Sequence, residues 1–255
     1  MNYHYFFMEL KNKTALITGA TGGLGKAIAR HLASENVNLI LLGRDEERLE
    51  KVKDCLEGVT NVQMRLCDLS NIEQVENVIK NITSQVDIVI NCAGVWKKSK
   101  PTEGIKYSEK KEMLAVNYLA PQKIIELLLP KLKEQNEAAI VNIISRSAIP
   151  DKELEEAGFK PKPPSVYSKT KIELRQFTNE LKDKLKNTSV QVAGVYPGGI
   201  KTDFHEKGGD KRKGTERYEK YIEPRDLADA VVKALSFPDL EDVKMFGDKD
   251  SLRFV

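Results

Sequence analysis

Residues 15–29 read ALITGATGGLGKAIA, a short apolar run followed by glycines and then by apolar residues at helical spacing. This order predicts a strand, a tight turn and a helix. Gly19, Gly23 and Gly25 let the backbone turn sharply and approach a ligand closely, while free N–H groups at the start of the helix attract phosphate oxygens. The stretch therefore indicates a site for a cofactor with a diphosphate, although a tight turn without any ligand uses glycines in the same way.

The same order of elements repeats along the chain. Further strands are predicted at residues 37–42, 62–66, 86–90, 139–144, 190–195 and 243–246, and helices at 46–56, 70–83, 108–135, 165–185 and from Pro224 onward. Because the apolar runs are continuous rather than alternating, they indicate parallel strands buried on both faces. We therefore expect an α/β fold, a Rossmann-like doubly wound parallel sheet of about seven strands with helices on both faces.

Two details of the helices are also predicted. Ser70 begins a capping box that opens the helix at 70–83. Pro121 and Pro130 bend or break the long helix at 108–135, because proline cannot donate a backbone hydrogen bond.

Composition restricts the class of protein. The chain has 255 residues, 41 Lys+Arg against 38 Asp+Glu, and no linker rich in Pro, Gly and Ser. We expect a single domain over residues 1–255 and no nucleic acid as main partner. No run approaches membrane-spanning length, and the first seven residues do not read as a signal peptide. The three widely spaced cysteines, Cys55, Cys67 and Cys92, predict reduced thiols, a cytoplasmic location and no metal site.

The second predicted strand ends in Gly43-Arg44 rather than in an acidic residue. An acidic side chain at this place would bind the ribose 2′-hydroxyl of NAD, whereas a guanidinium favours the 2′-phosphate of NADP. We therefore expect NADP(H), with NAD(H) possible. Alternatively, Arg44 is a solvated loop residue that pairs with Asp45 or Glu46.

Tyr167 and Lys171 lie four residues apart on a predicted helix and so share one face. An ammonium close to a phenol lowers the pKa of the phenol toward a value useful for proton transfer. An exposed aromatic–lysine pair would have the same spacing. Ser145, which ends the preceding strand, has a hydroxyl that can polarise a substrate carbonyl, and Ser147 is its local competitor.

These motifs together resemble those of the short-chain dehydrogenases/reductases, in the single-domain branch of roughly 250 residues. The chain carries T-G-x-x-x-G-x-G at 18–25, N-x-A-G at 91–94, Ser145, Y-x-x-x-K at 167–171 and P-G-x-x-x-T at 197–202, in the order of the family. The resemblance implies hydride transfer between a nicotinamide and a carbonyl or secondary alcohol of a small molecule. It gives Tyr167 the role of general acid/base.

The resemblance also assigns the other site residues. The catalytic set becomes Asn117, Ser145, Tyr167 and Lys171, with Asn117 holding a water that links Lys171 to solvent. The cofactor-binding residues become Gly19, Thr21, Gly23, Leu24, Gly25, Arg44, Asp68, Leu69, Asn91, Ala93, Gly94, Tyr167, Lys171, Pro197, Gly198, Ile200 and Thr202.

Two further expectations concern surfaces. The family places a substrate lid near residues 203–220, which are rich in Lys and Arg here. We expect this lid to be mobile without ligand and to be able to bind an anionic substrate through Lys211, Arg212 or Lys213. Family members also pair the helices at 108–135 and 165–185, which predicts a homodimer or homotetramer.

Two other functions remain open. One is sugar-nucleotide epimerisation on the same fold, against which the short chain and the glycine spacing argue. The other is a non-catalytic sensor or scaffold that binds NADP. A sensor has no need of the proton-transfer set, so the presence of all four residues favours an enzyme. The sequence does not identify the substrate.

Overall fold

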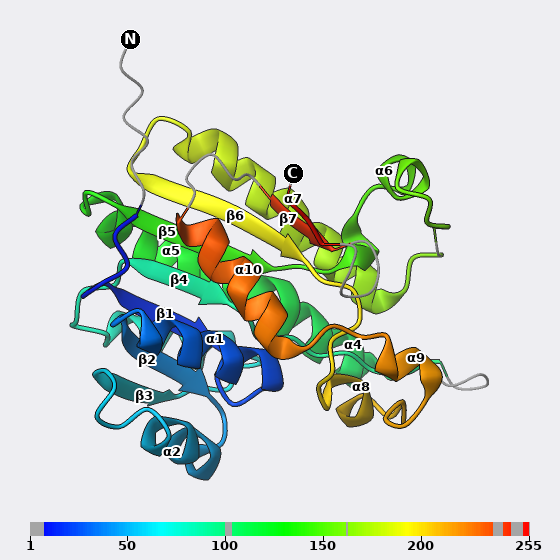
Figure 1. Cartoon of the computed structure of the whole chain (residues 1–255), viewed down its shortest axis with the longest axis horizontal. Coiled ribbons are helices and arrows are strands. Elements are labelled where there is room, and N and C mark those ends of the chain that lie inside the picture. Colours follow the sequence, from blue (N-terminus) through cyan, green and yellow to red (C-terminus); the bar gives the residue numbers. More distant parts are fainter. Residues whose placement is uncertain (1–7, 100–103, 162, 237–241, 246–251, 255) are drawn as a thin grey trace.

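The computed structural model describes residues 8–99, 104–161, 163–236, 242–245 and 252–254. At its centre lies a sheet of eight strands in the order β3-β2-β1-β4-β5-β6-β7-β8 (Figure 1). The strands are β1 (Thr14–Thr18), β2 (Asn38–Gly43), β3 (Val62–Leu66), β4 (Ile88–Asn91), β5 (Ala138–Ile143), β6 (Val190–Tyr196), β7 (Asp242–Met245) and β8 (Leu252–Phe254). Strands β1 to β7 are parallel, and β8 is antiparallel to β7. The predicted seven-stranded parallel sheet is confirmed, with one added edge strand.

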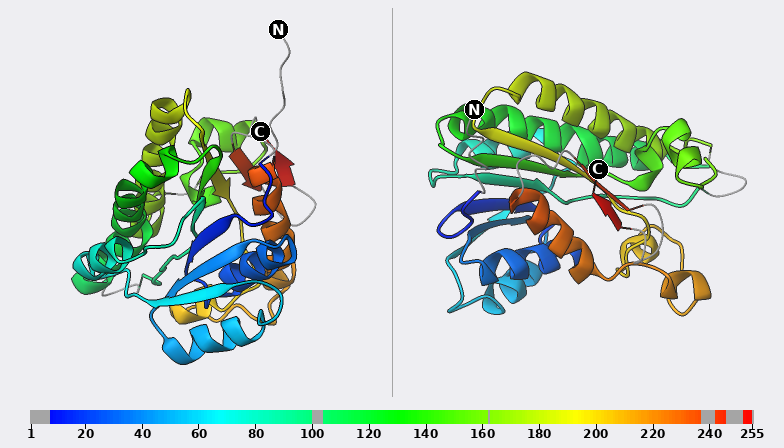
Figure 2. Two further views of the ribbon diagram at one scale, coloured as in Figure 1. Left: turned by 90° about the vertical axis from the view of Figure 1, so that its left-hand side faces the viewer. Right: turned by 45° about the horizontal axis from the view of Figure 1, so that its top comes forward.

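Helices cover both faces of the sheet (Figure 2). One layer holds α1 (Gly23–Ser34), α2 (Glu46–Asp54) and α10 (Pro224–Ser236), and the other holds α3 (Ile72–Lys80), α5 (Ala120–Lys133) and α7 (Val166–Leu185). Neighbouring residues of one strand enter opposite cores, since Ala15 and Ile17 pack in the first layer and Leu16 in the second. This alternation between two apolar cores explains why the strand sequences are continuously apolar.

The carboxyl ends of the parallel strands meet at one edge of the sheet. The strand order reverses between β1 and β4, which is where open α/β sheets bind ligands. The short helices α8 (Phe204–Lys207) and α9 (Glu216–Glu219) lie beyond the arrowheads of the central strands in Figure 1. The segment predicted as a lid therefore lies at the edge where the glycine turn lies.

The helix predicted at 108–135 bends in a different way from the one expected. α4 (Tyr107–Leu114) continues through a π-helical turn (Ala115–Leu119) into α5, and Pro130 lies inside α5 without ending it. In the π turn the Ala120 N–H bonds to the Ala115 carbonyl, five residues back. Pro121 has no N–H, so the helix widens just before it instead of breaking.

The predicted cap of α3 is wrong by one residue. Asn71 is the N-cap, and its side chain accepts the Gln74 N–H. The Ser70 hydroxyl is used elsewhere, since it donates to the Asp68 carboxylate at 2.8 Å. At the other end of the chain, Phe246 of the predicted final strand lies outside the described residues.

Candidate active site

The glycine turn between β1 and α1 packs against the loop that follows β4. Gly19 has φ 66°, and a Cβ at this position would lie 2.8 Å from the Ala93 Cα. The Thr18 hydroxyl accepts the N–H groups of Cys92 and Ala93, both at 3.1 Å. Only glycine satisfies both the left-handed backbone and the close approach, so this contact fixes two of the predicted cofactor segments against each other.

The loop after β6 closes on the same turn. A Cβ on Gly23 would lie 2.6 Å from the Thr202 Cγ2, so glycine is needed for Thr202 to lie over the start of α1. The rest of this loop is held by its backbone, since the Pro197 carbonyl accepts the Arg146 N–H at 2.8 Å and Ile200 forms a bridge to Ile222. Thr202, one of the predicted residues of this loop, thus lies against the start of the phosphate-attracting helix.

Buried amides connect β4 to α7, the helix that carries Tyr167 and Lys171. Asn91 donates to the Asn142 side-chain oxygen at 2.9 Å, and Asn142 donates in turn to the Thr178 hydroxyl at 2.9 Å. Thr178 then donates to the Leu174 carbonyl of α7. This series of hydrogen bonds runs from β4 through β5 to α7. Asn91 therefore contributes to the packing of the site. Asn142 and Thr178 were not among the predicted site residues.

Arg44 follows β2 on the surface of the site. Its side chain is 69% exposed, and its Nη1 lies 3.7 Å from a Glu112 oxygen of α4. The predicted alternative pairing with Asp45 or Glu46 is therefore wrong, and Asp45 instead caps α2 by accepting the Arg48 N–H. An exposed ion pair of this length contributes little free energy, so Arg44 can exchange Glu112 for another anion.

A second guanidinium lies beside the glycine turn. The Arg48 Nη2 donates to the Thr21 carbonyl at 3.0 Å. The pKa of Lys207 is lowered by its burial and then by repulsion from nearby cations, among them Arg48, Arg44 and Lys26. Positive charge therefore gathers at this end of the site. Arg48 was not predicted as a site residue. Its place in the first turn of the helix that directly follows Arg44 could have indicated it.

Asp68 and Leu69 follow β3 at the same edge. The Asp68 carboxylate accepts both the backbone N–H and the hydroxyl of Ser70, at 2.9 and 2.8 Å. The Asp68 N–H donates to Gln74 of α3. These bonds fix the loop that carries Asp68, one of the residues expected to bind the cofactor.

Lys171 is buried under the site, with 3% of its surface exposed. Its Nζ donates to the Ile143 carbonyl at the end of β5, 2.8 Å away. Burial disfavours the ammonium and lowers the pKa of Lys171 to about 8.

The expectation that Lys171 lowers the pKa of Tyr167 is wrong for this structure. Burial raises the pKa of Tyr167 to about 12, and the hydrogen-bonding influence of Ser145 acts in the opposite direction. Removal of the phenol from water outweighs the neighbouring groups, because a phenolate loses more solvation than a phenol does. Tyr167 is therefore in its neutral form at pH 7.

Ser145 and its competitor Ser147 interact directly. The Ser147 N–H and hydroxyl both donate to the Ser145 Oγ, at 3.2 and 3.0 Å. A serine oxygen has two lone pairs and one hydrogen. With both lone pairs engaged by Ser147, the Ser145 hydrogen is the group left to donate to a third partner, which agrees with the role expected of Ser145.

Asn117 lies in the π turn, and its amide holds the loop after β4. Its Oδ1 accepts the Val95 N–H at 2.8 Å, and its Nδ2 donates to the Val95 carbonyl and to the Thr170 hydroxyl. The side chain thus serves structure. The backbone carbonyl of Asn117 cannot receive the usual bond from four residues ahead, because that residue is Pro121.

The chain matches the family described as short chain dehydrogenase over residues 13–213. The chain belongs to the short-chain dehydrogenase family. An oxidoreductase of Staphylococcus aureus is 34% identical over 90% of this chain and 93% of its own length, and one of Staphylococcus saprophyticus is 32% identical over 91% and 94%. An alcohol dehydrogenase of Thermococcus sibiricus, solved with 5-hydroxy-NADP, is 28% identical with a TM-score of 0.78, over 94% of this chain and 97% of its own.

Membership makes this chain an oxidoreductase of the nicotinamide-dependent type, as the resemblance implied. Within the described residues no helix is long and apolar enough to cross a membrane. The same part of the chain holds no group of three or more His, Cys, Asp or Glu side chains able to bind a metal ion.

Residues 203–220, predicted as a lid and called the lid below, carry their own acidic partners. Arg212 bonds to Asp210 at 2.6 Å, and Lys213 bonds to Asp203 at 2.6 Å. Lys98, which follows β4, also reaches Asp210, at 2.9 Å. Two of the three cations predicted to bind an anionic substrate, Arg212 and Lys213, are therefore already paired with carboxylates.

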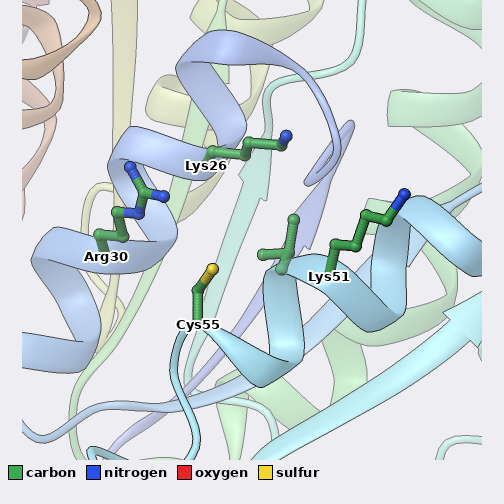
Figure 3. Close-up of a pocket in the computed structure, with 5 residues that line it drawn as sticks. Lys26, Arg30, Lys51 and Cys55 are labelled. Carbon is green, nitrogen blue, oxygen red and sulfur yellow. The ribbon is translucent and has the colours of Figure 1, made fainter.

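One small hollow of about 120 Å³ lies between α1 and α2, outside the predicted site. Figure 3 shows Lys26 and Arg30 of α1 on one side of it and Lys51 and Cys55 on the other. Cys55 is exposed, whereas Cys67 is buried. Burial raises the pKa of the Cys67 thiol to about 11 and that of Cys92 to about 12, so neither is a reactive thiolate.

Proposed function

We propose that this protein is an NADP(H)-dependent reductase or dehydrogenase that moves hydride between the nicotinamide and a carbonyl or secondary alcohol of a small molecule. One observation carries the proposal. A Cβ on Gly94 would lie 3.6 Å from the Asn117 Oδ1 and 3.9 Å from the Lys171 Nζ. The loop assigned to the cofactor and the residues assigned to proton transfer therefore meet at one point, as the reaction requires.

The residues at the carboxyl edge fit a dinucleotide. Gly19 and Gly23 clear the start of α1, whose first N–H groups suit a diphosphate. Lys171 is assigned the nicotinamide ribose, while the nicotinamide, when bound, supplies or accepts the hydride. The 2′-phosphate of NADP is assigned to the positive end of the site, at Arg44 and Arg48.

The chain itself supplies the proton. Tyr167 stays neutral at pH 7 because its pKa is raised to about 12, so it donates its proton to the oxygen of a carbonyl that is being reduced. Ser145 donates a hydrogen bond to the same oxygen and polarises the carbonyl. The Asn117 backbone carbonyl, which Pro121 leaves without its helical donor, is assigned the water that reconnects Lys171 to solvent.

The setting of the enzyme belongs to the same proposal. Residues 1–255 act as one unit in the cytoplasm, on a small molecule and without nucleic acid. Ile124, Ile125 and Leu128 of α5 are buried within the chain and so are not available to the proposed homodimer or homotetramer. Its remaining support is Leu127, Tyr118 and Phe177, which are only partly buried on the α5 and α7 side.

Oxidation of NADPH by a panel of aldehydes and ketones tests the proposal, followed through the near-ultraviolet absorbance of the reduced nicotinamide. The reverse reaction uses NADP and secondary alcohols. We expect turnover with some members of the panel and faster turnover with NADPH than with NADH. Tight NADPH binding without turnover of any carbonyl or alcohol would support the sensor alternative. Conversion of a sugar nucleotide without net change in NADPH would support the epimerase alternative.

A further inference from the structure

Aromatic side chains of the lid reach the catalytic tyrosine. The Phe204 ring meets the Tyr167 ring edge-on, with centroids 6.0 Å apart and an angle of 62° between the planes. His205 contacts Phe204 at 5.6 Å and Trp96 at 5.4 Å between centroids. The three residues Trp96, Phe204 and His205, here called the aromatic wall, therefore run from Tyr167 to the loop after β4.

The aromatic wall lies where a substrate has to bind. A Cβ on Gly94 would be 3.5 Å from the Phe204 Cε2 and 3.9 Å from the Lys171 Nζ, so Phe204 is beside the point at which the cofactor loop and the catalytic residues meet. A carbonyl held by the Tyr167 hydroxyl has its substituents within reach of this ring. Phe204 and Trp96 are both partly exposed, so part of each ring is available to a ligand.

Contacts of the backbone hold the aromatic wall in place. The Gly208 carbonyl accepts the Lys98 N–H at 2.9 Å, and a Cβ on Gly208 would overlap the Trp96 ring. The Lys98 side chain adds an ion pair to Asp210 at 2.9 Å. The lid and the loop after β4 are thus joined beside Trp96, which fixes the position of the rings before any ligand binds.

Among the described residues, the two ionisable side chains in contact with the Trp96 ring, Arg212 and His205, offer no free charge to a ligand. Arg212 lies over the Trp96 ring at 5.6 Å, but its guanidinium donates to Asp210 at 2.6 Å and to the Tyr221 hydroxyl at 2.8 Å. His205 is neutral at pH 7, because burial, helped by Arg212, lowers its pKa to about 4. The rings presented toward Tyr167 are therefore apolar, and the guanidinium beside them is already paired.

We propose that Phe204 and Trp96 determine the substrate specificity of this enzyme, and that its substrate is an uncharged carbonyl compound with an aromatic group on the carbonyl carbon. This inference rests on the proposed function. Pairing of aromatic rings adds about two- to tenfold to binding beyond the area buried. It competes with the expectation of an anionic substrate held by Lys211, Arg212 or Lys213, of which Arg212 and Lys213 already bond to carboxylates of the lid.

The test compares acetophenone with cyclohexyl methyl ketone, which have equal numbers of carbons but differ in the flatness of the ring. Wild-type enzyme is expected to have the higher kcat/KM for acetophenone, and Phe204→Leu to lower the ratio of the two values about three- to tenfold. Tyr218→Leu is the matched control, since Tyr218 contacts Tyr221 at the far side of the lid and should leave the ratio unchanged. 4-Acetylbenzoate should react more slowly than acetophenone.

Binding provides a readout that does not need turnover. Benzamide and cyclohexanecarboxamide imitate the two ketones without being reduced, and Trp96, the single tryptophan, reports their binding to the enzyme with NADP present. We expect tighter binding of benzamide, and loss of this preference in Phe204→Leu. Equal preferences in wild type and Phe204→Leu would overturn the inference even if ketones are reduced. Absence of any turnover would instead count against the proposed function, and the amide comparison would still decide the role of the wall.

Discussion

The groups predicted for proton transfer and the charged groups of the lid hold their polar atoms in opposite ways. Lys171 and Asn117 are almost completely buried and give their polar atoms to backbone carbonyls, a backbone N–H and a buried hydroxyl. In the lid, Lys213 and Asp203 are about half exposed and bond mainly to each other. Water and salt screen exposed pairs much more than buried groups. We therefore expect the largest effects of substitution at the few buried groups, although the lid carries more charges.

Lys171→Met tests the buried side of this comparison and has the largest expected effect. The side chain keeps its approximate size but loses the ammonium assigned to the cofactor ribose and to proton transfer. We expect kcat/KM to fall by a factor on the order of a thousand and NADPH to bind more weakly. Steady-state kinetics and a titration followed by Trp96 fluorescence check the two effects. An unchanged dissociation constant for NADPH would remove Lys171 from the cofactor site.

Substitution of the charged residues assigned to the 2′-phosphate should have an effect of intermediate size. Arg44 is exposed but is assigned to the 2′-phosphate, together with Arg48 beside the Thr21 carbonyl. We expect Arg44→Asp to weaken NADPH binding about ten- to a hundredfold and to leave NADH binding nearly unchanged, because only NADPH carries the second phosphate.

Arg48→Ala is expected to act in the same direction with a smaller effect. Lys11→Ala, which changes a lysine that is exposed at the start of the chain, serves as the control for loss of a positive charge. Equal losses for NADPH and NADH in Arg44→Asp would contradict the assignment of the 2′-phosphate.

Lys171→Met has a second consequence, for stability. The pKa of Lys171 is lowered to about 8 in the folded protein from an ordinary value of 10.5, so folding below pH 8 keeps a charge in a site that disfavours it. Removing the charge gains about 3 kcal/mol, and losing the bond to Ile143 costs about 1 kcal/mol. We expect the variant to be more stable than wild type by about 2 kcal/mol at pH 7.

The pH dependence of that gain gives its signature. Below pH 8 the wild-type penalty is present in full, and it declines as pH rises from 8 toward 10.5, where the unfolded chain also loses the proton. Urea unfolding at pH 7 and at pH 10 measures the difference. A variant that is less stable than wild type at both pH values would show that Lys171 contributes to the fold rather than straining it.

Substitution of a charged residue in the lid is expected to have the smallest effect. Lys213→Ala removes an exposed partner of Asp203, so we expect a change of less than about 1 kcal/mol in stability and less than about threefold in KM. The stability of the variant should be nearly the same at low and at moderate salt, whereas that of wild type should vary with salt. A tenfold or larger rise in KM for an anionic substrate would restore the lid as a reader of charge.

Most of the fold could be predicted because its signals are local. The continuous apolar runs predicted buried parallel strands, and Gly19 and Gly23 predicted a turn that the contacts with Ala93 and Thr202 do require. The added strand β8 was not predicted, since three residues near the chain end carry too little pattern. The π turn before Pro121 was missed because a proline alone does not say whether a helix breaks or widens.

The candidate site was predictable only in part for a similar reason. Its motifs occupy short stretches, and the structure brings these stretches together at one edge of the sheet. The pKa of Tyr167 depends instead on burial, to which distant elements contribute, including Phe204. Partners such as Asp210 for Arg212, and Thr21 for Arg48, are likewise set by the fold rather than by spacing along the chain.

The proton donor is the central claim, and Tyr167→Phe measures it most directly. The change removes the hydroxyl and keeps the ring that packs on Phe204. With wild type and variant both saturated with NADPH, as shown by Trp96 fluorescence, we predict that reduction of a carbonyl substrate slows by a factor on the order of a thousand while the dissociation constant for NADPH changes less than about threefold. Reduction at a rate close to that of wild type would contradict the account, because the proton would then come from another group.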